Sequence, residues 1–202
     1  MADDEPVWVG ADPGGKLNFG VAILRHTGVV ESKCLDSADE AIAYVLKNVA
    51  RCPAGVGVDA PLWWSSGISG DRHADQWLRR RYGLSGGEVQ AANSLRGAAL
   101  TQGAMFVHRL RSIYPSVPIT ETHPKAILKA IFNDDWLVFT SKFQIDTPPV
   151  NEHCRDALIG AVAARESSQG RWTHDLALTR LPSEQDPLSY WLAPVHYYWP
   201  EP

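Results

Sequence analysis

The chain of 202 residues lacks several features that would place it in a specialised class of protein. It has no apolar run near the roughly 20 residues that cross a bilayer, so we expect no membrane partner. The acidic start, MADDEP, has neither the basic nor the apolar part of a secretory signal, which predicts a cytoplasmic location. The three cysteines fit neither a disulfide framework nor zinc-ligand spacing. They are interpreted as small buried or half-buried hydrophobes: Cys34, Cys52 and Cys154.

Positive charge is also scarce. Lys and Arg number 19 against 23 Asp and Glu, which gives a formal net charge of −4. This balance argues against a protein held on nucleic acid by a broad basic surface, although an enzyme could still engage a few phosphates locally. With 45% hydrophobic residues, the chain has enough apolar content for a single domain over 1–202, with its core at about 7–168.

The stretch from Val7 to Leu24, VWVGADPGGKLNFGVAIL, provides the first candidate site. Two apolar runs flank a Pro-Gly-Gly turn, which predicts a strand, a tight turn and a returning strand. Asp12 stands at the end of the first strand, as either a turn residue or a functional acid. After a turn at His26–Gly28, a third antiparallel strand is predicted over Val29–Leu35.

The next segment predicts a helix followed by a buried strand. Ser37 and Glu40 fit a capping box, and an apolar stripe at helical spacing follows them. The strand after this helix ends at Asp59. A strand–helix–strand connection is right-handed, which makes this strand parallel to the first. Asp12 and Asp59 would then meet at the carboxyl edge of the sheet, where open α/β sheets bind ligands.

Residues 62–96 are predicted to be an inserted helix and lid. Asp71 is expected to cap a helix that runs through Arg81, with 84–92 as a mobile segment. The arginines at 79–81 are interpreted as offsetting the helix dipole, with a local phosphate-binding patch as the alternative.

The second half of the chain supplies two more acids. A helix over 97–113 precedes a short strand that ends in Glu121, and another helix begins at Pro124. Residues 133–150 are predicted to be a linker before a helix, 152–168, that Asn151 caps and that has small residues on its inner face. Asp156 shares a helical face with Glu152 and His153. The aromatic segment 169–202 is expected to pack over the domain, with a homodimer contact as the alternative.

Four carboxylates thus occupy matching places in the predicted topology. Buried like charges repel, and a cluster of them is tolerable chiefly when a cation neutralises it. Oxygen-only ligands favour Mg²⁺ or Mn²⁺ over zinc. The predicted metal ligands and catalytic acids are Asp12, Asp59, Glu121 and Asp156.

The order β-β-β-α-β-α-β-α, with an Asp on the first strand, resembles the ribonuclease H-like fold, and the acid order resembles its Holliday-junction resolvase branch. One family in particular is similar over about Val7 to Glu166: domain of unknown function family 429, predicted ribonuclease H-like nucleases. The strings that carry this resemblance are GADPGGKLNFGVAIL, GVGVDAPLWW, RHADQWLRRRYG, ITETHPKAIL and HCRDALIGAVAAR. It implies a three-layer α/β fold, a mixed sheet with helices on both faces. It also assigns the four acids to metal, matches Arg72 and Asp75 to an Arg-x-x-Asp segment, and gives His153 a role in positioning water or phosphate.

The leading functional hypothesis is a Mg²⁺- or Mn²⁺-dependent nuclease that acts on nucleic acid. Its expected substrate contacts are Lys16, Arg72, His123, Lys125 and His153. A nucleotide-binding phosphotransferase of the actin and sugar-kinase type is one alternative, although it normally needs two such halves and the chain has no repeat. A non-catalytic scaffold or nucleic-acid-binding module is the other.

Overall fold

The computed structural model describes residues 5–28, 30–95, 97–147, 149 and 151–200. Some sequence predictions therefore concern positions outside the described residues. These are Val29 at the start of the third strand, Arg96 at the end of the inserted segment, Pro148 and Val150 in the linker, and the two chain ends, 1–4 and 201–202.

Five strands form one mixed sheet in the order β3-β2-β1-β4-β5. Their bounds are β1 Val7–Asp12, β2 Phe19–Arg25, β3 Val30–Leu35, β4 Gly55–Val58 and β5 Ile119–Glu121. The first three strands pair antiparallel, and β1, β4 and β5 run parallel. The predicted α/β class, the opening meander and the parallel pairing of the first and fourth strands are confirmed.

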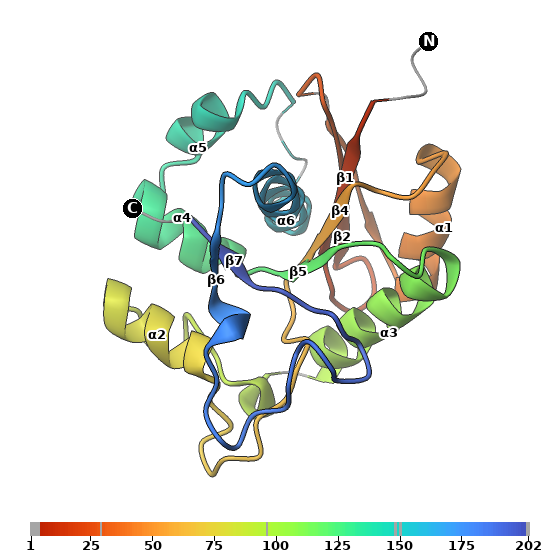
Figure 1. Ribbon diagram of the computed structural model, residues 1–202. Helices are drawn as coiled ribbons and strands as arrows, with labels where there is room; N and C mark the ends of the chain where they lie inside the picture. Colours follow the sequence, from red (N-terminus) through yellow and green to blue (C-terminus); the bar gives the residue numbers. More distant parts are fainter. Residues whose placement is uncertain (1–4, 29, 96, 148, 150, 201–202) are drawn as a thin grey trace.

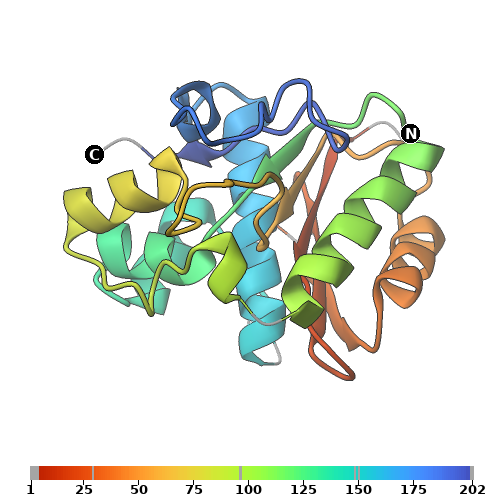
Figure 2. The same ribbon diagram turned by 90° about the horizontal axis from the view of Figure 1, so that it is seen from below.

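Helices cover both faces of this sheet (Figures 1 and 2). On one face lie α1, Ala38–Asn48, and α3, Gly97–Ile113; on the other lies α6, Glu152–Ser168. The caps predicted at Ser37 and Asn151 are confirmed, because Ser37 accepts a hydrogen bond from the Glu40 amide and Asn151 accepts one from the Cys154 amide. Asn151 thereby fixes where α6 begins. The Glu40 side chain accepts from the Asp36 amide and not from the Ser37 amide, which a full capping box would require.

Small residues let α6 lie directly on the backbone of the sheet. A Cβ atom added at Gly10 of β1 would overlap the Ala157 carbonyl oxygen, and one added at Gly57 of β4 would overlap the Gly160 carbonyl oxygen. The inner face of α6 is built from Ala157, Gly160, Ala161 and Ala164, all buried. This close approach holds the first turns of α6 against the strand ends.

The inserted segment contains α2, His73–Tyr82, and the short helix η1, Ala92–Ser94. The prediction that Asp71 caps the helix is wrong: the helix begins at His73 with Arg72 at the N-cap position. The Asp75 carboxylate accepts a hydrogen bond from the Arg72 amide, while Asp71 pairs with Arg79 in the second half of the helix. The cap is therefore supplied from inside the helix.

The predicted linker 133–150 is also wrong, because it contains a helix. After α4, Pro124–Phe132, the chain turns and forms α5, Trp136–Phe143. Asp135 caps α5 by accepting hydrogen bonds from the amides of Leu137 and Val138. The helix is held by packed aromatic rings: Phe132, Trp136, Phe139 and Phe143.

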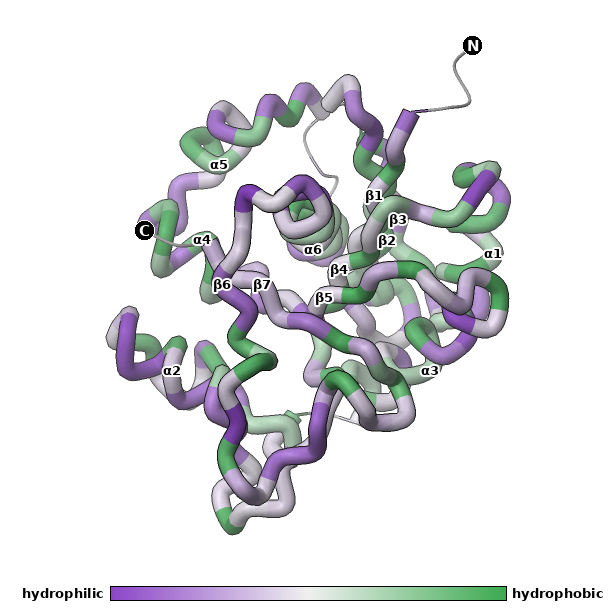
Figure 3. The backbone as a smooth tube through the Cα atoms, viewed as in Figure 1, coloured by the Kyte–Doolittle hydropathy of each residue, from purple (hydrophilic) through white to green (hydrophobic). Residues whose placement is uncertain are grey.

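The C-terminal segment packs over the domain, as predicted. It forms a two-stranded sheet, β6 His174–Asp175 with β7 Tyr198–Trp199, and the short helix η2, Leu176–Leu178. Trp199 is fully buried. The tube in Figure 3 is partly green where the central strands lie, and the apolar residues of these strands belong to the buried core. Among the described residues, no helix has the length and apolarity that a membrane span needs.

Candidate functional site

The predicted acids come from neighbouring strand ends and from α6. Asp12 is the last residue of β1, Asp59 follows β4 directly, and Glu121 is the last residue of β5. The parallel pairing of β1 with β4 and of β4 with β5 places these three positions along one edge of the sheet. Asp156 lies in the second turn of α6, on the buried face.

Asp12 is an acid whose ionisation is disfavoured by its surroundings. Its pKa is raised to about 6, chiefly by burial and also by the negative charge of Asp156. His153 opposes the shift, because its Nδ1 lies 2.8 Å from Asp12 Oδ2. Asp12 and His153 are 141 residues apart in sequence, and the N-terminal turn of α6 brings them together.

Asp59 and Asp156 complete a group of acids that repel one another. Burial raises the pKa of Asp59 well above its ordinary value, and Asp12 and Asp156 raise it further. Burial also raises the pKa of Asp156, although Arg155 contacts one of its oxygens at 2.8 Å and Lys125 lies 3.9 Å from the other. The local cations therefore offset only part of the negative charge of this group.

Glu121 is arranged differently, because both of its oxygens are bound to Arg72. The guanidinium Nη2 lies 2.6 Å from Oε1, Nη1 lies 2.8 Å from Oε2, and the Leu62 amide also donates to Oε2. Burial raises the pKa of Glu121 despite the attraction of Arg72. All of these hydrogen bonds are donated to Glu121, as a carboxylate requires.

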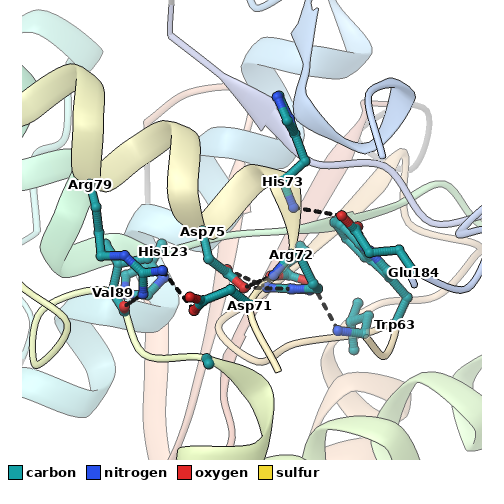
Figure 4. Close-up of polar contacts among 12 residues, drawn as sticks. Trp63, Asp71, Arg72, His73, Asp75, Arg79, Val89, His123 and Glu184 are labelled. Atoms are coloured by element: carbon teal, nitrogen blue, oxygen red, sulfur yellow. Dashed lines mark hydrogen bonds and ion pairs between the residues drawn. The ribbon is translucent and has the colours of Figure 1, made fainter. Parts of the chain in front are cut away.

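Arg72 is the centre of a buried ionic network (Figure 4). Its side chain is only 1% exposed, and each of its three nitrogens donates to a carboxylate, that of Asp75 or that of Glu121. The guanidinium carbon also lies 4.2 Å above the centre of the Trp63 ring. Burial disfavours its charge, but the two carboxylates outweigh this and raise the pKa of Arg72 further. The Arg-x-x-Asp segment therefore has a structural role here.

The acids suit a divalent cation in charge and in ligand type. Asp12, Asp59 and Asp156 offer hard oxygen donors, and their mutual repulsion would be relieved by positive charge. Among the described residues, however, no three His, Cys, Asp or Glu side chains are already arranged as ligands of one ion. Binding would therefore require side-chain movements, including release of Asp156 Oδ1 from Arg155.

Comparison with known proteins adds no further assignment. No family model, curated protein or solved structure matches this chain.

A cavity of about 200 Å³ opens beside Asp59 and Glu121. Its remaining walls include small or apolar side chains and polar groups from three segments: Ala60, Pro61, Leu95, Ala99, Gln90, Thr122, His123 and Lys125. Thr122 follows β5, and its hydroxyl is buried with no hydrogen-bond partner among the described residues. An unpartnered buried hydroxyl is costly.

The predicted lid, 84–92, borders this cavity and is fastened along its length. His123 Nε2 lies 2.7 Å from the Glu88 carbonyl oxygen, and because a carbonyl only accepts, this nitrogen carries the hydrogen. The Glu88 side chain pairs with Lys129, and Arg79 donates to the Val89 carbonyl. Burial lowers the pKa of His123, which favours the neutral ring. The opening of this segment stays a prediction.

The five predicted substrate contacts have different positions. His153 binds Asp12, and Lys125 lies beside Asp156 on the rim of the cavity, with its side chain exposed. Lys16 is exposed in the turn between β1 and β2. The guanidinium of Arg72 is bound by two carboxylates, and the imidazole Nε2 of His123 by a carbonyl. Substrate binding by any of the five stays a prediction.

Sequence reasoning missed Glu184, which holds the inserted segment to the C-terminal segment (Figure 4). Its carboxylate accepts hydrogen bonds from the Trp63 indole, at 2.9 Å, and from the His73 amide, at 2.6 Å. It therefore fixes both ends of the loop that precedes α2. The surrounding sequence has no periodicity and offers no signal for this contact.

The raised pKa of Asp12 predicts how stability changes with pH. Its pKa is about 6 when folded against an ordinary value of 3.8 in an unfolded chain, so the folded state holds more protons between these values. The contribution of Asp12 to the free energy of unfolding therefore falls as pH rises through this window, by at most about 3 kcal/mol. Asp12→Asn removes this titration.

We expect the free energy of unfolding of Asp12→Asn, relative to the unchanged protein, to increase from about pH 4 to about pH 6.5. Urea unfolding in the presence of a chelator measures it. Asp39→Asn is the matched control, because the Asp39 side chain is 64% exposed. If the free energies of unfolding of the unchanged protein and of Asp12→Asn changed in parallel with pH, the prediction would be contradicted.

Proposed function

We propose that this protein is a Mg²⁺- or Mn²⁺-dependent nuclease that hydrolyses phosphodiester bonds of nucleic acid. One observation carries the proposal: burial raises the pKa values of Asp12, at the end of β1, and of Asp59, after β4, and the charge of Asp156 on α6 raises both further. A group of acids that repel one another is unfavourable for a purely structural role. It is favourable for a site that takes up a divalent cation.

The strand order supports a ribonuclease H-like interpretation of the fold. An antiparallel meander, β1 to β3, continues through parallel strands β4 and β5, and the acids follow the carboxyl ends of β1, β4 and β5. Compared with the order β-β-β-α-β-α-β-α, the chain has the additional helices α2 and η1 before α3, and α4 and α5 before α6. These additions border the cavity or the outer surface and leave the central order intact.

Each residue of this site would have its own role in the reaction. Asp12, Asp59 and Asp156 would hold the cation, which when bound would lower the pKa of water and stabilise negative charge on a phosphate. His153 would orient Asp12 through the contact at Nδ1, leaving Nε2 for water or phosphate. Lys125 would place positive charge near a phosphate oxygen at the rim. Glu121, bound to Arg72, would support the position of β5 and contribute charge from beneath the site.

The proposal predicts that Asp12→Asn lowers the rate of phosphodiester cleavage at least about 100-fold, because it removes a charge that acts in the transition state. Single strands, duplexes, RNA–DNA hybrids and branched DNA, each with Mg²⁺ and with Mn²⁺, form the substrate set. Asp39→Asn should cleave at the unchanged rate. Unfolding curves must show that Asp12→Asn is folded, so that the lost rate reports on chemistry.

A second measurement tests the cation without any substrate. Mn²⁺ should raise the unfolding temperature of the unchanged protein and of Asp39→Asn, but not that of Asp12→Asn. Equal cleavage by Asp12→Asn and the unchanged protein would overturn the assignment of the acid. Mn²⁺ binding without cleavage of any of the four substrates would favour a non-catalytic module instead.

A further inference from the structure

Two of the three cysteines meet where α6 begins, although 120 residues separate them in sequence. Cys34 lies on β3 and Cys154 in the first turn of α6, and their Sγ atoms are 3.6 Å apart. Cys154 is fully buried, whereas Cys34 is half-buried and reaches the surface. One thiol is therefore accessible to a reagent in solution, and its neighbour is not.

The backbone explains why the two sulfurs meet. Cys34 pairs with Gly20 on β2, and paired residues of antiparallel strands point to the same face of the sheet. A Cβ atom added at Gly20 would overlap the His153 carbonyl oxygen and would lie 3.2 Å from the Cys154 amide. The missing side chain of Gly20 thus lets the first turn of α6 settle beside Cys34. The arrangement is held by the backbone of three elements.

Asn151 adds a further constraint on both residues. Its Oδ1 accepts the Cys154 amide hydrogen at 2.9 Å as the cap of α6, and its Nδ2 lies 3.0 Å from Cys34 Sγ. Each cysteine is therefore held by the same side chain. To form a disulfide, the sulfurs would have to approach from 3.6 Å to roughly 2.05 Å.

We propose that Cys34 and Cys154 form a thiol–disulfide modification site, in which an oxidant of the small-molecule disulfide class links β3 to the first turn of α6. The Cys34 thiolate attacks one sulfur of the reagent, which breaks the reagent's S–S bond and releases one thiolate. Cys154 sulfur then attacks Cys34 Sγ, displaces the second small thiolate and gives up its proton to it. The protein loses two protons and two electrons in total, and the reagent takes them up and becomes two thiols.

The cross-link would reach the acids without touching them. Cys154 is next to His153, which contacts Asp12, and two residues from Asp156. Fixing this turn on β3 restricts the side chains that would have to move to hold a cation. The formation of the bond itself does not depend on the proposed function.

Oxidised glutathione is the probe, and Cys52→Ser is the starting protein. Cys52 is exposed, and its thiol donates to the Pro53 carbonyl, so it would otherwise add an unrelated adduct. After oxidation we expect an intact mass lower by about two hydrogens, no retained glutathione, and a peptide that joins Cys34 to Cys154. The closed loop should raise the unfolding temperature by about 10 °C, reversed by a reducing thiol.

Two further variants on the same background separate the roles of the cysteines. Cys154→Ala should stop at a stable glutathione adduct on Cys34, and Cys34→Ala should remain unmodified because Cys154 is buried. The readout on Cys52→Ser alone keeps the test valid if Cys154→Ala does not fold. A glutathione adduct that persists on Cys34 in Cys52→Ser, or two thiols that both stay free, would overturn the proposal.

Discussion

Replacing Arg72 with Ala is expected to lower the free energy of unfolding by about 3–5 kcal/mol, because it leaves two buried carboxylates without their partner. Arg72 is 1% exposed, and its Nε donates to Asp75, its Nη1 to Glu121 and its Nη2 to both carboxylates. The substitution also removes the contact with the Trp63 ring. Equilibrium unfolding in urea at neutral pH measures the loss.

Arg25→Ala is the matched control for this experiment. Arg25 pairs with Glu31 at 2.6 Å, but both side chains are 37% exposed, so water replaces the lost partner. We expect this variant to lose no more than about 1 kcal/mol. Equal losses for the two arginine variants would show that burial does not strengthen the Arg72 network. A smaller loss for Arg72→Ala at acid pH is expected, since protonation of Glu121 and Asp75 relieves their charges.

Gly10→Ala is expected to destabilise the protein by about 3 kcal/mol, since the added methyl group has no space. Its Cβ would overlap the Ala157 carbonyl oxygen, which belongs to the backbone of α6 and has no rotamer to change. Either β1 or α6 must move, and both contribute acids to the candidate site. Urea unfolding measures the loss.

Gly15→Ala provides the control, from the turn that follows β1. A Cβ added there meets no atom within 4 Å, so a change of no more than about 0.5 kcal/mol is expected. If Gly10→Ala matched Gly15→Ala in stability, the close approach of α6 to the sheet would not be needed. The same pair can be tested for Mn²⁺-dependent stabilisation, which should weaken only in Gly10→Ala.

The parts of the fold that could be predicted from the sequence are those that depend on neighbouring residues. Ser37 and Asn151 cap helices through amides three residues away, and the strands of the meander follow from apolar runs between turns. The parallel pairing of β4 with β1 was predicted from the strand–helix–strand connection that contains α1. Each of these depends on local chemistry or on one general rule of chain geometry.

The features that were not predicted depend on a choice between competing local structures or partners, or on contacts between residues far apart in the sequence. The helix α5 was overlooked because WLVFTSKF has apolar residues on several sides, although Asp135 was a readable cap. Asp71 was predicted to cap α2, but in the fold Asp71 pairs with Arg79 and Asp75 accepts the Arg72 amide at the start of the helix. Glu121 was predicted as an acid at a strand end, but its pairing with Arg72, 49 residues away, has no local signature.

The position of α6 in chain order bears on how the protein folds. This helix covers β1, β2 and β4, yet it ends at Ser168, so the sheet cannot bury that face until most of the chain has been made. The contacts that complete the core therefore close long loops, and folding is expected to be slow compared with that of a helical bundle of similar length. During synthesis the exposed face of the meander would be the surface most in need of protection by a chaperone.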